Sequence, residues 1–155
     1  MANKSNGMLF EFSTTDPASY STLGQLVDIT VPSITKDAIE ITDHGSAGVR
    51  EFTGGLIDNG ECTCVVNYDV EDSGSGTDNH KDLRDLAATV YETTTNKSFK
   101  ISFPDRDDDS SQTDELSMTF AGIVTGFEMS TPIDGVIQAT FTIKVSGAIT
   151  YGDAS

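Results

Sequence analysis

The sequence predicts a mainly β fold, an antiparallel β-sandwich or partly closed barrel with one flanking α-helix. Three observations support this fold class. Several segments alternate apolar and polar residues with a period of two, one segment has apolar residues at helical spacing, and Ser and Thr are abundant. The length of 155 residues suits one domain with a sizeable core. We expect residues 23–150 to form that domain, after an N-terminal arm (1–22) and before a short C-terminal tail (151–155).

The first half of the domain contains three predicted strands. Leu26–Pro32 is a β-branched apolar run that Pro32 closes, and Ala38–Thr42 alternates. Residues 42–55 follow as a long loop, rich in turn-forming residues, that can include an irregular strand at its end. Asp58-Asn59-Gly60 is a tight-turn signal that leads into a third strand, Glu61–Val70.

The second half begins with the predicted helix, at about residues 79–91. Its apolar residues fall at positions i, i+3, i+4 and i+7: Leu83, Leu86, Ala87 and Val90. Alternating strands follow at 98–103, 116–129 and 137–145, and a change of phase at Gly122 predicts a bulge or bend. Before the domain, Met8–Phe12 is the one segment of the arm that is expected to be structured.

The only two cysteines, Cys62 and Cys64, lie two positions apart in the predicted strand 61–70. Their side chains therefore point to the same face of the strand, and so close a pair is poorly placed for an unstrained disulfide. We expect free thiols that act as small apolar residues on the core face. The opposite face of this strand is mostly polar.

The charge of the chain excludes some classes of partner. The net charge is −16 and the pI is about 4.1. A protein that wraps DNA or holds an anionic membrane needs a Lys- and Arg-rich surface, which this composition does not supply. The N-terminus lacks the apolar stretch of a signal peptide and no run approaches the length of a membrane helix, so we expect neither.

The sequence offers no catalytic constellation, metal site or cofactor site. His44 and His80 have no motif partner nearby, and a surface or interface position is expected for both. Asp105, Asp107 and Asp109 have the spacing that starts a calcium loop. The required Gly and Glu are replaced by Ser110 and Leu116, so a solvated acidic loop is expected. We therefore expect a protein that is not an enzyme.

Three segments together resemble the major tail tube proteins of long-tailed, non-contractile bacteriophages. They are the pair of early strands (26–32 and 38–42), the stretch Val49–Glu61 with its Phe-Thr-Gly-Gly-Leu sequence and acidic Gly turn, and the C-terminal series of a helix and three strands. The similarity spans about residues 20–150, and the order and spacing of the segments support it. Those proteins have the β-sandwich or barrel with one helix that the residues here predict independently.

The resemblance implies a structural virion protein of the phage tail, made and assembled in the host cytoplasm. Subunits would form hexameric rings with a continuous barrel around a lumen, and the rings would stack into a hollow tube that conducts double-stranded DNA. Implied partners are further copies of the chain, a tape measure protein, and tail-tip or baseplate and tail terminator proteins. DNA would pass through without being bound specifically, and no membrane binding is implied.

Two sets of candidate site residues follow from this resemblance. The loop that would reach the next ring contains His44, Gly45, Gly48, Arg50, Glu51, Phe52, Gly54 and Gly55. The polar face of the strand 61–70 is a candidate lining for the lumen, with Glu61, Thr63, Asn67 and Asp69. An acidic lining would repel the duplex, although the same residues also suit an ordinary solvated face.

Other functions remain open from the sequence. The same fold serves as the inner tube of contractile tails and of type VI secretion machines, and in gene transfer agents. A monomeric β-sandwich binding module is a different class of function. The absence of Trp and the presence of only four Tyr make a sugar-binding module less favourable, because such modules stack sugars on exposed aromatic rings.

Overall fold

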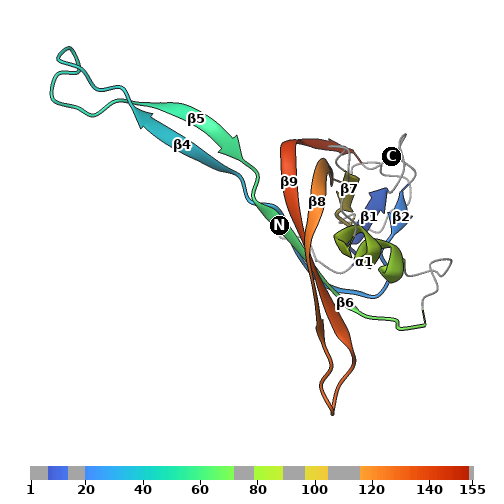
Figure 1. Cartoon of the computed structure of the whole chain (residues 1–155). Helices are drawn as coiled ribbons and strands as arrows, with labels where there is room; N and C mark the ends of the chain where they lie inside the picture. Colours follow the sequence, from blue (N-terminus) through green and yellow to red (C-terminus); the bar gives the residue numbers. More distant parts are fainter. Residues whose placement is uncertain (1–6, 14–19, 72–78, 89–96, 105–115, 154–155) are drawn as a thin grey trace.

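The structure is a computed structural model that describes residues 7–13, 20–71, 79–88, 97–104 and 116–153 (Figure 1). Its nine strands and one helix run in the order β1 (Leu9–Ser13), β2 (Ser21–Thr22), β3 (Leu26–Thr30), β4 (Thr35–Glu40), β5 (Phe52–Asp58), β6 (Glu61–Asn67), α1 (His80–Ala88), β7 (Lys97–Ser102), β8 (Leu116–Ser130) and β9 (Gln138–Asp153). Among these described residues, no helix is long and apolar enough to span a bilayer.

Seven strands form one antiparallel sheet in the order β2-β1-β7-β8-β9-β6-β3, which curls into a half-barrel. β4 and β5 form a separate two-stranded sheet. In Figure 1 this second sheet projects from one end of the molecule, and the turn between β8 and β9 projects from the other. The predicted fold class, a mainly β protein with a partly closed antiparallel sheet and one helix, is confirmed.

The core lies on one face of the large sheet, where apolar side chains alternate with polar ones. In β6, Cys62, Cys64 and Val66 are completely buried, and their antiparallel partners in β9 are Ile143, Phe141 and Ala139. Phe99 and Phe120 stack in the neighbouring strands with ring centroids 5.8 Å apart. Both cysteines are free and buried, as the alternation of the sequence predicts.

Helix α1 packs its apolar stripe on the core through Leu83 and Leu86, which are both buried. The predicted helix was longer, at 79–91, and its residues 89–91 lie outside the described part of the chain. His80 is fully buried in the first turn, so the expected surface position is wrong for this residue. The reason is that the helix begins directly against the end of β6, where the imidazole finds polar partners.

The imidazole of His80 connects two segments that are distant in sequence. Its Nδ1 accepts a hydrogen bond from the backbone N–H of Asp69 (3.0 Å), so Nε2–H donates to the carbonyl of Gly24 (2.8 Å). The ring also stacks on Tyr68 at 5.4 Å. A buried, fully partnered histidine of this kind holds the connection before β3 to the end of β6.

Part of the predicted N-terminal arm lies within the sheet. β1 pairs with both β2 and β7, and its Phe10 and Phe12 are buried in the core. β9 likewise continues through Tyr151–Asp153, into the segment expected to be a tail. The acidic residues 105–109 lie outside the described residues.

β8 and β9 form a long hairpin whose register shifts twice, once between Thr119 and Ala121 and once between Val124 and Gly126. The expected irregularity near Gly122 is therefore present, and β8 continues through it as one strand. Gly122 itself is a close backbone approach. A Cβ added there would lie 2.6 Å from the carbonyl oxygen of Lys144, a distance that the backbone must relieve by moving.

We expect Gly122→Ala to lower the free energy of unfolding by about 1–3 kcal/mol, because the added methyl group must displace the paired β9 backbone. Chemical denaturation of the two proteins measures this difference. Gly126→Ala is the matched control in the same strand, since its Cβ would meet Thr142 Cβ at an ordinary 3.5 Å. Equal unfolding midpoints for the two variants would contradict the prediction.

Candidate functional site

The β4–β5 hairpin has apolar side chains with no cover on either side. Every residue of β4 is exposed, and the exposed fractions of Ile39, Phe52 and Leu56 are 52%, 54% and 87%. A two-stranded hairpin is marginally stable alone in water, and contiguous exposed apolar surface marks a site of interaction. The hairpin is therefore the first candidate contact surface of the molecule.

The loop at the end of this hairpin, between Glu40 and Phe52, is shorter than the loop predicted at 42–55 because Phe52–Asp58 are paired with β4. It is held by its own polar groups. Ser46 Oγ donates to the Glu51 carboxylate (2.8 Å), and the N–H groups of Gly45 and Glu51 donate to Asp43 Oδ1 (2.8 Å) and Thr42 Oγ1 (2.9 Å). Local side-chain hydrogen bonds of this kind fix a turn.

The eight predicted stacking residues are thus divided between two settings. His44, Gly45, Gly48, Arg50 and Glu51 lie in the end loop, whereas Phe52, Gly54 and Gly55 lie in β5. Only Gly48 of the four glycines has a positive φ, at 80°. Gly54 instead leaves room for the Lys36 side chain, whose Cε an added Cβ would overlap. Arg50 and Glu40 form an exposed ion pair at 3.9 Å, which contributes little stability.

The root of the hairpin is attached to β9 by several polar contacts. Lys144 Nζ lies 3.1 Å from Asp58 Oδ1, and Val145 N–H donates to the Gly60 carbonyl (3.1 Å). Asn59 Nδ2 donates to the Gly147 carbonyl (2.5 Å). The Gly60 N–H and then Lys144 lower the pKa of Asp58, because both favour the charged carboxylate. These contacts set the direction in which the hairpin leaves the sheet.

A second candidate surface is the face of β3, β6, β9 and β8 opposite the core. The register places Glu61 beside Lys144, Thr63 beside Thr142, and Asn67 beside Gln138. Three of the four predicted lumen residues therefore share one face. Asp69 does not, because β6 ends at Asn67 and the Asp69 backbone turns to His80.

This face is rich in threonine and weakly acidic. Its cross-strand neighbours add Asp28 and Thr30 from β3, Thr140 from β9 and Glu128 from β8. The face carries three carboxylates, those of Asp28, Glu61 and Glu128. Its one cation is Lys144, which is paired with Asp58. The prediction missed the β3 and β8 contributions, although the alternation in 137–145 already placed Thr140, Thr142 and Lys144 opposite the apolar residues.

The same four strands have two open edges among the described residues. β3 is the last strand of the sheet, and the pairing of β7 with β8 stops at Gly122, which leaves Ile123–Ser130 without a paired strand on that side. The end of α1 lies near Thr125–Phe127 of this segment. An open edge presents unpaired backbone N–H and C=O groups that can add another strand. Because β8 and β6 run opposite to β9 and β3, β3 of one copy would meet β8 of another in antiparallel orientation.

The described residues contain no cluster of three or more His, Cys, Asp or Glu side chains that could hold a metal ion. His44 is exposed in the end loop and His80 is occupied by backbone partners. The surfaces with an evident chemical purpose are therefore the apolar hairpin and the polar sheet face with its open edges, and both suit association.

Comparison with known sequences gives one family. The sequence model described as "Lambda phage tail tube protein, TTP" matches residues 4–152. No significant match was found among curated proteins.

Solved structures share the fold over nearly the whole chain. The sheath-tube complex of an extracellular contractile injection system (PVC) has a TM-score of 0.71 at 11% identity, covering 99% of this chain and 93% of that one. The tail of a gene transfer agent particle, refined with C6 symmetry, has a TM-score of 0.66 at 12% identity, covering 97% and 99%. The SPP1 tail tube has a TM-score of 0.66 at 12% identity, covering 99% and 80%.

Proposed function

The chain belongs to the lambda phage tail tube protein family, and from this we propose that it assembles as stacked rings into the hollow tube of a phage tail. The observation that carries the proposal is that one subunit has two surfaces suited to association. The β4–β5 hairpin exposes apolar side chains on an otherwise unsupported element, and the polar sheet has an open edge on each side. We propose that other copies of this chain cover both surfaces.

Within a ring, we propose that β3 of one subunit pairs with Ile123–Ser130 of its neighbour. The antiparallel orientation continues the sheet, and a heterologous contact of this kind closes into a ring when its rotation divides a full turn. Six subunits per ring agree with the C6 symmetry of the gene transfer agent tail, which has the same fold. The closed sheet would form a barrel with the threonine-rich face turned inward.

Between rings, we propose that the β4–β5 hairpin reaches the next ring. The hairpin leaves the sheet at one end of β6, so it projects beyond the barrel rather than across it (Figure 1). Its end loop places His44, Gly45, Gly48, Arg50 and Glu51 farthest from the body, and Phe52 lies at the start of β5. Docking would bury the apolar side chains that water now contacts and would stabilise the hairpin.

The proposed lumen conducts double-stranded DNA without holding it. Phosphates are bound by Lys and Arg through release of counterions, and the inward face carries three carboxylates against one paired lysine. Threonine hydroxyls keep the rest of the wall hydrated without adding charge. Repulsion acts within about 8–10 Å of the wall at ordinary salt, which suits a duplex that slides close to it.

If the chain is a subunit of the virion tail, its site of synthesis and its assembly partners follow. The subunit would be made in the host cytoplasm, nucleate on a tail-tip or baseplate complex, surround a tape measure protein and end at a terminator. The inner tube of a contractile tail or of a gene transfer agent is the second candidate, because the PVC and gene transfer agent tubes share this fold.

Electron microscopy of the purified protein at rising concentration, with mass measured in parallel, tests the proposal. Hollow tubes of uniform width support it. If only monomers are seen, tail-tip complexes from neighbouring genes are added as nuclei. A protein that stays monomeric with such nuclei present would overturn the tube assignment and favour a monomeric binding module.

Reversal of charge in the proposed lumen should affect DNA passage and not assembly. We expect particles with Glu61→Lys and Glu128→Lys to form tubes of normal width but to eject DNA about tenfold more slowly, because phosphates would bind the wall. Release of DNA on addition of receptor measures this rate at several salt concentrations. Glu71→Lys, an exposed residue beyond β6, is the control. If Glu61→Lys and Glu128→Lys leave the ejection rate unchanged, the polar face of β6 and β8 does not line the lumen.

A further inference from the structure

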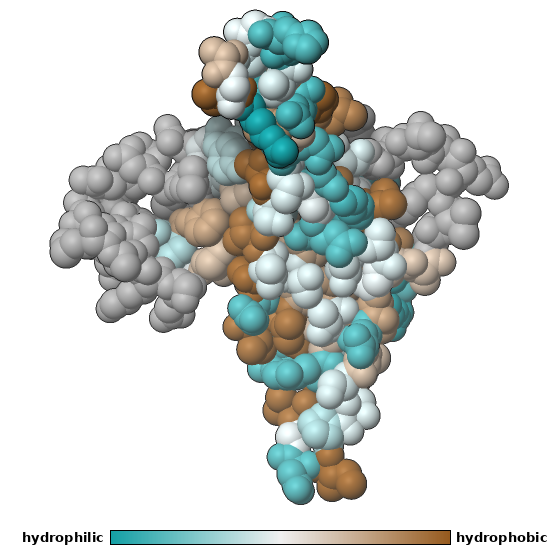
Figure 2. Space-filling view, turned by 90° about the vertical axis from the view of Figure 1, so that its left-hand side faces the viewer, coloured by the Kyte–Doolittle hydropathy of each residue, from teal (hydrophilic) through white to brown (hydrophobic). Residues whose placement is uncertain are grey.

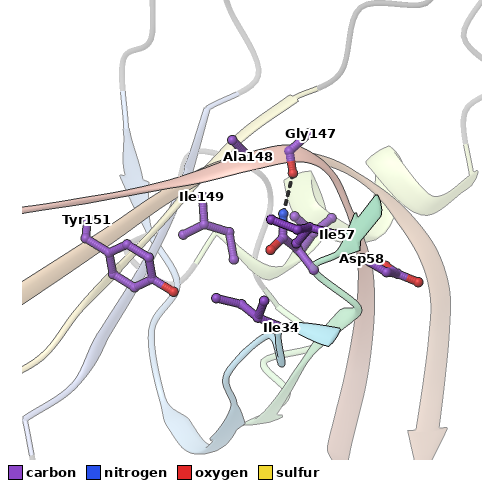
Figure 3. Close-up of a pocket in the computed structure, with 9 residues that line it drawn as sticks. Ile34, Ile57, Asp58, Gly147, Ala148, Ile149 and Tyr151 are labelled. Carbon is purple, nitrogen blue, oxygen red and sulfur yellow. Dashed lines mark hydrogen bonds between the residues drawn. The ribbon is translucent and has the colours of Figure 1, made fainter. Parts of the chain in front are cut away.

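A groove lies at the root of the β4–β5 hairpin, on the side of β9 (Figure 3). Ile34 and Ile57 line it from the hairpin, and Ile149 and Tyr151 line it from β9. Its volume is about 440 Å³, and it is open to solvent. Figure 3 shows these four side chains converging on the same space, with the hydrogen bond from Asn59 to Gly147 beside them.

The groove exists because β9 is irregular at this point. Between the pairs Thr119–Thr150 and Ala121–Ser146 the register shifts, and Gly147 has a φ of 80°. The bulge carries Ile149 away from regular pairing and toward the hairpin. Ile34, Ile57 and Tyr151 remain 55%, 58% and 50% exposed, so the groove is apolar and unfilled within the single chain.

A matching projection occupies the other end of the molecule. The turn between β8 and β9 contains Ile133, whose exposed fraction of 101% means that no other residue covers it. Val136 in the same turn is 58% exposed. Figure 2 shows a hydrophobic residue beside hydrophilic ones at the lower end of the molecule, and further hydrophobic residues on its upper projection.

The two features lie at opposite ends of one strand pair. β9 leaves the turn at Gln138, which pairs with Asn67, and reaches the groove at Val145, next to the Glu61–Lys144 pair. A knob at one end and a hole at the other permit a head-to-tail contact that repeats along one direction. This is the geometry that stacked subunits require, and the inference accordingly rests on the proposed function.

Charge also favours this match. Asp134 follows Ile133 in the turn, so the knob carries a carboxylate beside its apolar tip. Lys36 is the cross-strand partner of Ile57, so it lies on the face of the hairpin that lines the groove. Asp58, which also lines the groove, is already paired with Lys144. Among the described residues Lys36 forms no such pair, and its side chain lies over Gly54, from where its ammonium can meet a carboxylate of another subunit.

We propose that the groove formed by Ile34, Ile57, Ile149 and Tyr151 receives Ile133 of a second copy of this chain in the adjacent ring. Val136 packs on the rim of the groove, and Asp134 approaches Lys36. The contact is separate from the docking of the hairpin itself, because it uses the root of the hairpin and the opposite end of the neighbouring subunit. It fixes the axial register between rings at the point where the hairpin is attached.

A disulfide trap tests the contact directly. In assembled tubes of the Ile133→Cys and Ile57→Cys double variant, mild oxidation should link subunits into axial chains that denaturing gels resolve as ladders. Native Cys62 and Cys64 are buried and give no background. Each single variant should remain monomeric on the gel. Tubes that form normally but give no ladder would overturn the inference and leave the proposed function intact, whereas an absence of tubes in the wild type with tail-tip nuclei would overturn the proposed function.

Substitution at the knob gives a second readout. Ile133→Asp should raise the protein concentration needed for tube formation at least tenfold, about the factor expected when one isoleucine is no longer buried. Ile133→Val should change it little, and Val70→Asp, at an exposed apolar position outside both the turn and the groove lining, is the control. Because Ile133 is fully exposed in the monomer, the fold of the monomeric variants should be unchanged. Equal assembly by Ile133→Asp and the wild type would contradict the contact.

Discussion

Ile39→Asp combined with Phe52→Asp is expected to abolish tube formation and to leave the monomer folded. The two side chains are 52% and 54% exposed, and they lie on opposite faces of the β4–β5 hairpin because Ile39 pairs with Thr53 and Phe52 with Glu40. Burial of each side chain is worth about 1.5–3 kcal/mol, so loss of both should raise the concentration needed for assembly by at least about hundredfold.

Sedimentation and electron microscopy measure assembly of this variant, and thermal unfolding measures its monomer. The main sheet makes no use of either side chain, so the midpoint of unfolding should stay close to that of the wild type. Ile39→Val with Phe52→Leu retains the apolar surface and serves as the matched control. Normal tubes from the Asp variant would show that the hairpin does not stack rings.

Phe141→Ala is expected to have the largest effect on stability. The ring is completely buried on the core face of β9, 5.1 Å from the ring of Phe127, and its cross-strand partner in β6 is Cys64. Truncation of a buried phenylalanine costs about 3–5 kcal/mol, a large part of the 5–15 kcal/mol that is typical for a domain. The unfolding midpoint in urea should fall sharply, and the variant should fail to assemble because its monomer is unstable.

Phe52→Ala is the matched control for this core substitution. It removes the same side chain from an exposed hairpin position, so the free energy of unfolding should change by less than about 0.5 kcal/mol. The pair of variants thus separates stability from assembly, since Phe52→Ala should weaken tubes and not the monomer. A similar loss of stability in both would mean that the hairpin is part of the cooperative core.

Regular alternation accounts for the part of the fold that the sequence predicts well. β6 and β9 carry one apolar face, so Cys62, Cys64 and Phe141 could be assigned to the core without a structure. The helix follows in the same way from the spacing of Leu83 and Leu86. In each case one face is buried and the other is solvated, and the spacing of apolar residues in the sequence reflects this difference.

The parts that the sequence predicts less fully depend on contacts between distant segments. β1 is short and stands between polar stretches, and only its pairing with β7 makes Phe10 and Phe12 core residues. Gly54 and Gly55 suggest a loop, but in β5 they accommodate the side chains of Lys36 and Asp37 from the opposite strand. Burial of His80 likewise depends on the backbone of Gly24 and Asp69.

In the candidate site, too, local sequence predicts some features, whereas others depend on contacts between distant segments. Glu61, Thr63 and Asn67 could be grouped from alternation within one strand, but the turn of Asp69 toward His80 breaks the pattern after the strand ends. Open edges are a property of sheet order, which local sequence does not specify. The groove at the hairpin root depends on a bulge in β9 and on Ile34, which are more than 100 residues apart.

The burial of Cys62 and Cys64 has a consequence for durability outside the cell. A virion leaves a reducing cytoplasm for an oxidising medium, where an accessible thiolate would be attacked or would cross-link subunits at random. The hydrogen bond with Cys62, together with burial, raises the pKa of the Cys64 thiol well above its ordinary value, so the reactive thiolate is disfavoured. The particle would therefore carry both cysteine thiols buried, and exposure to air should not cross-link its subunits through them.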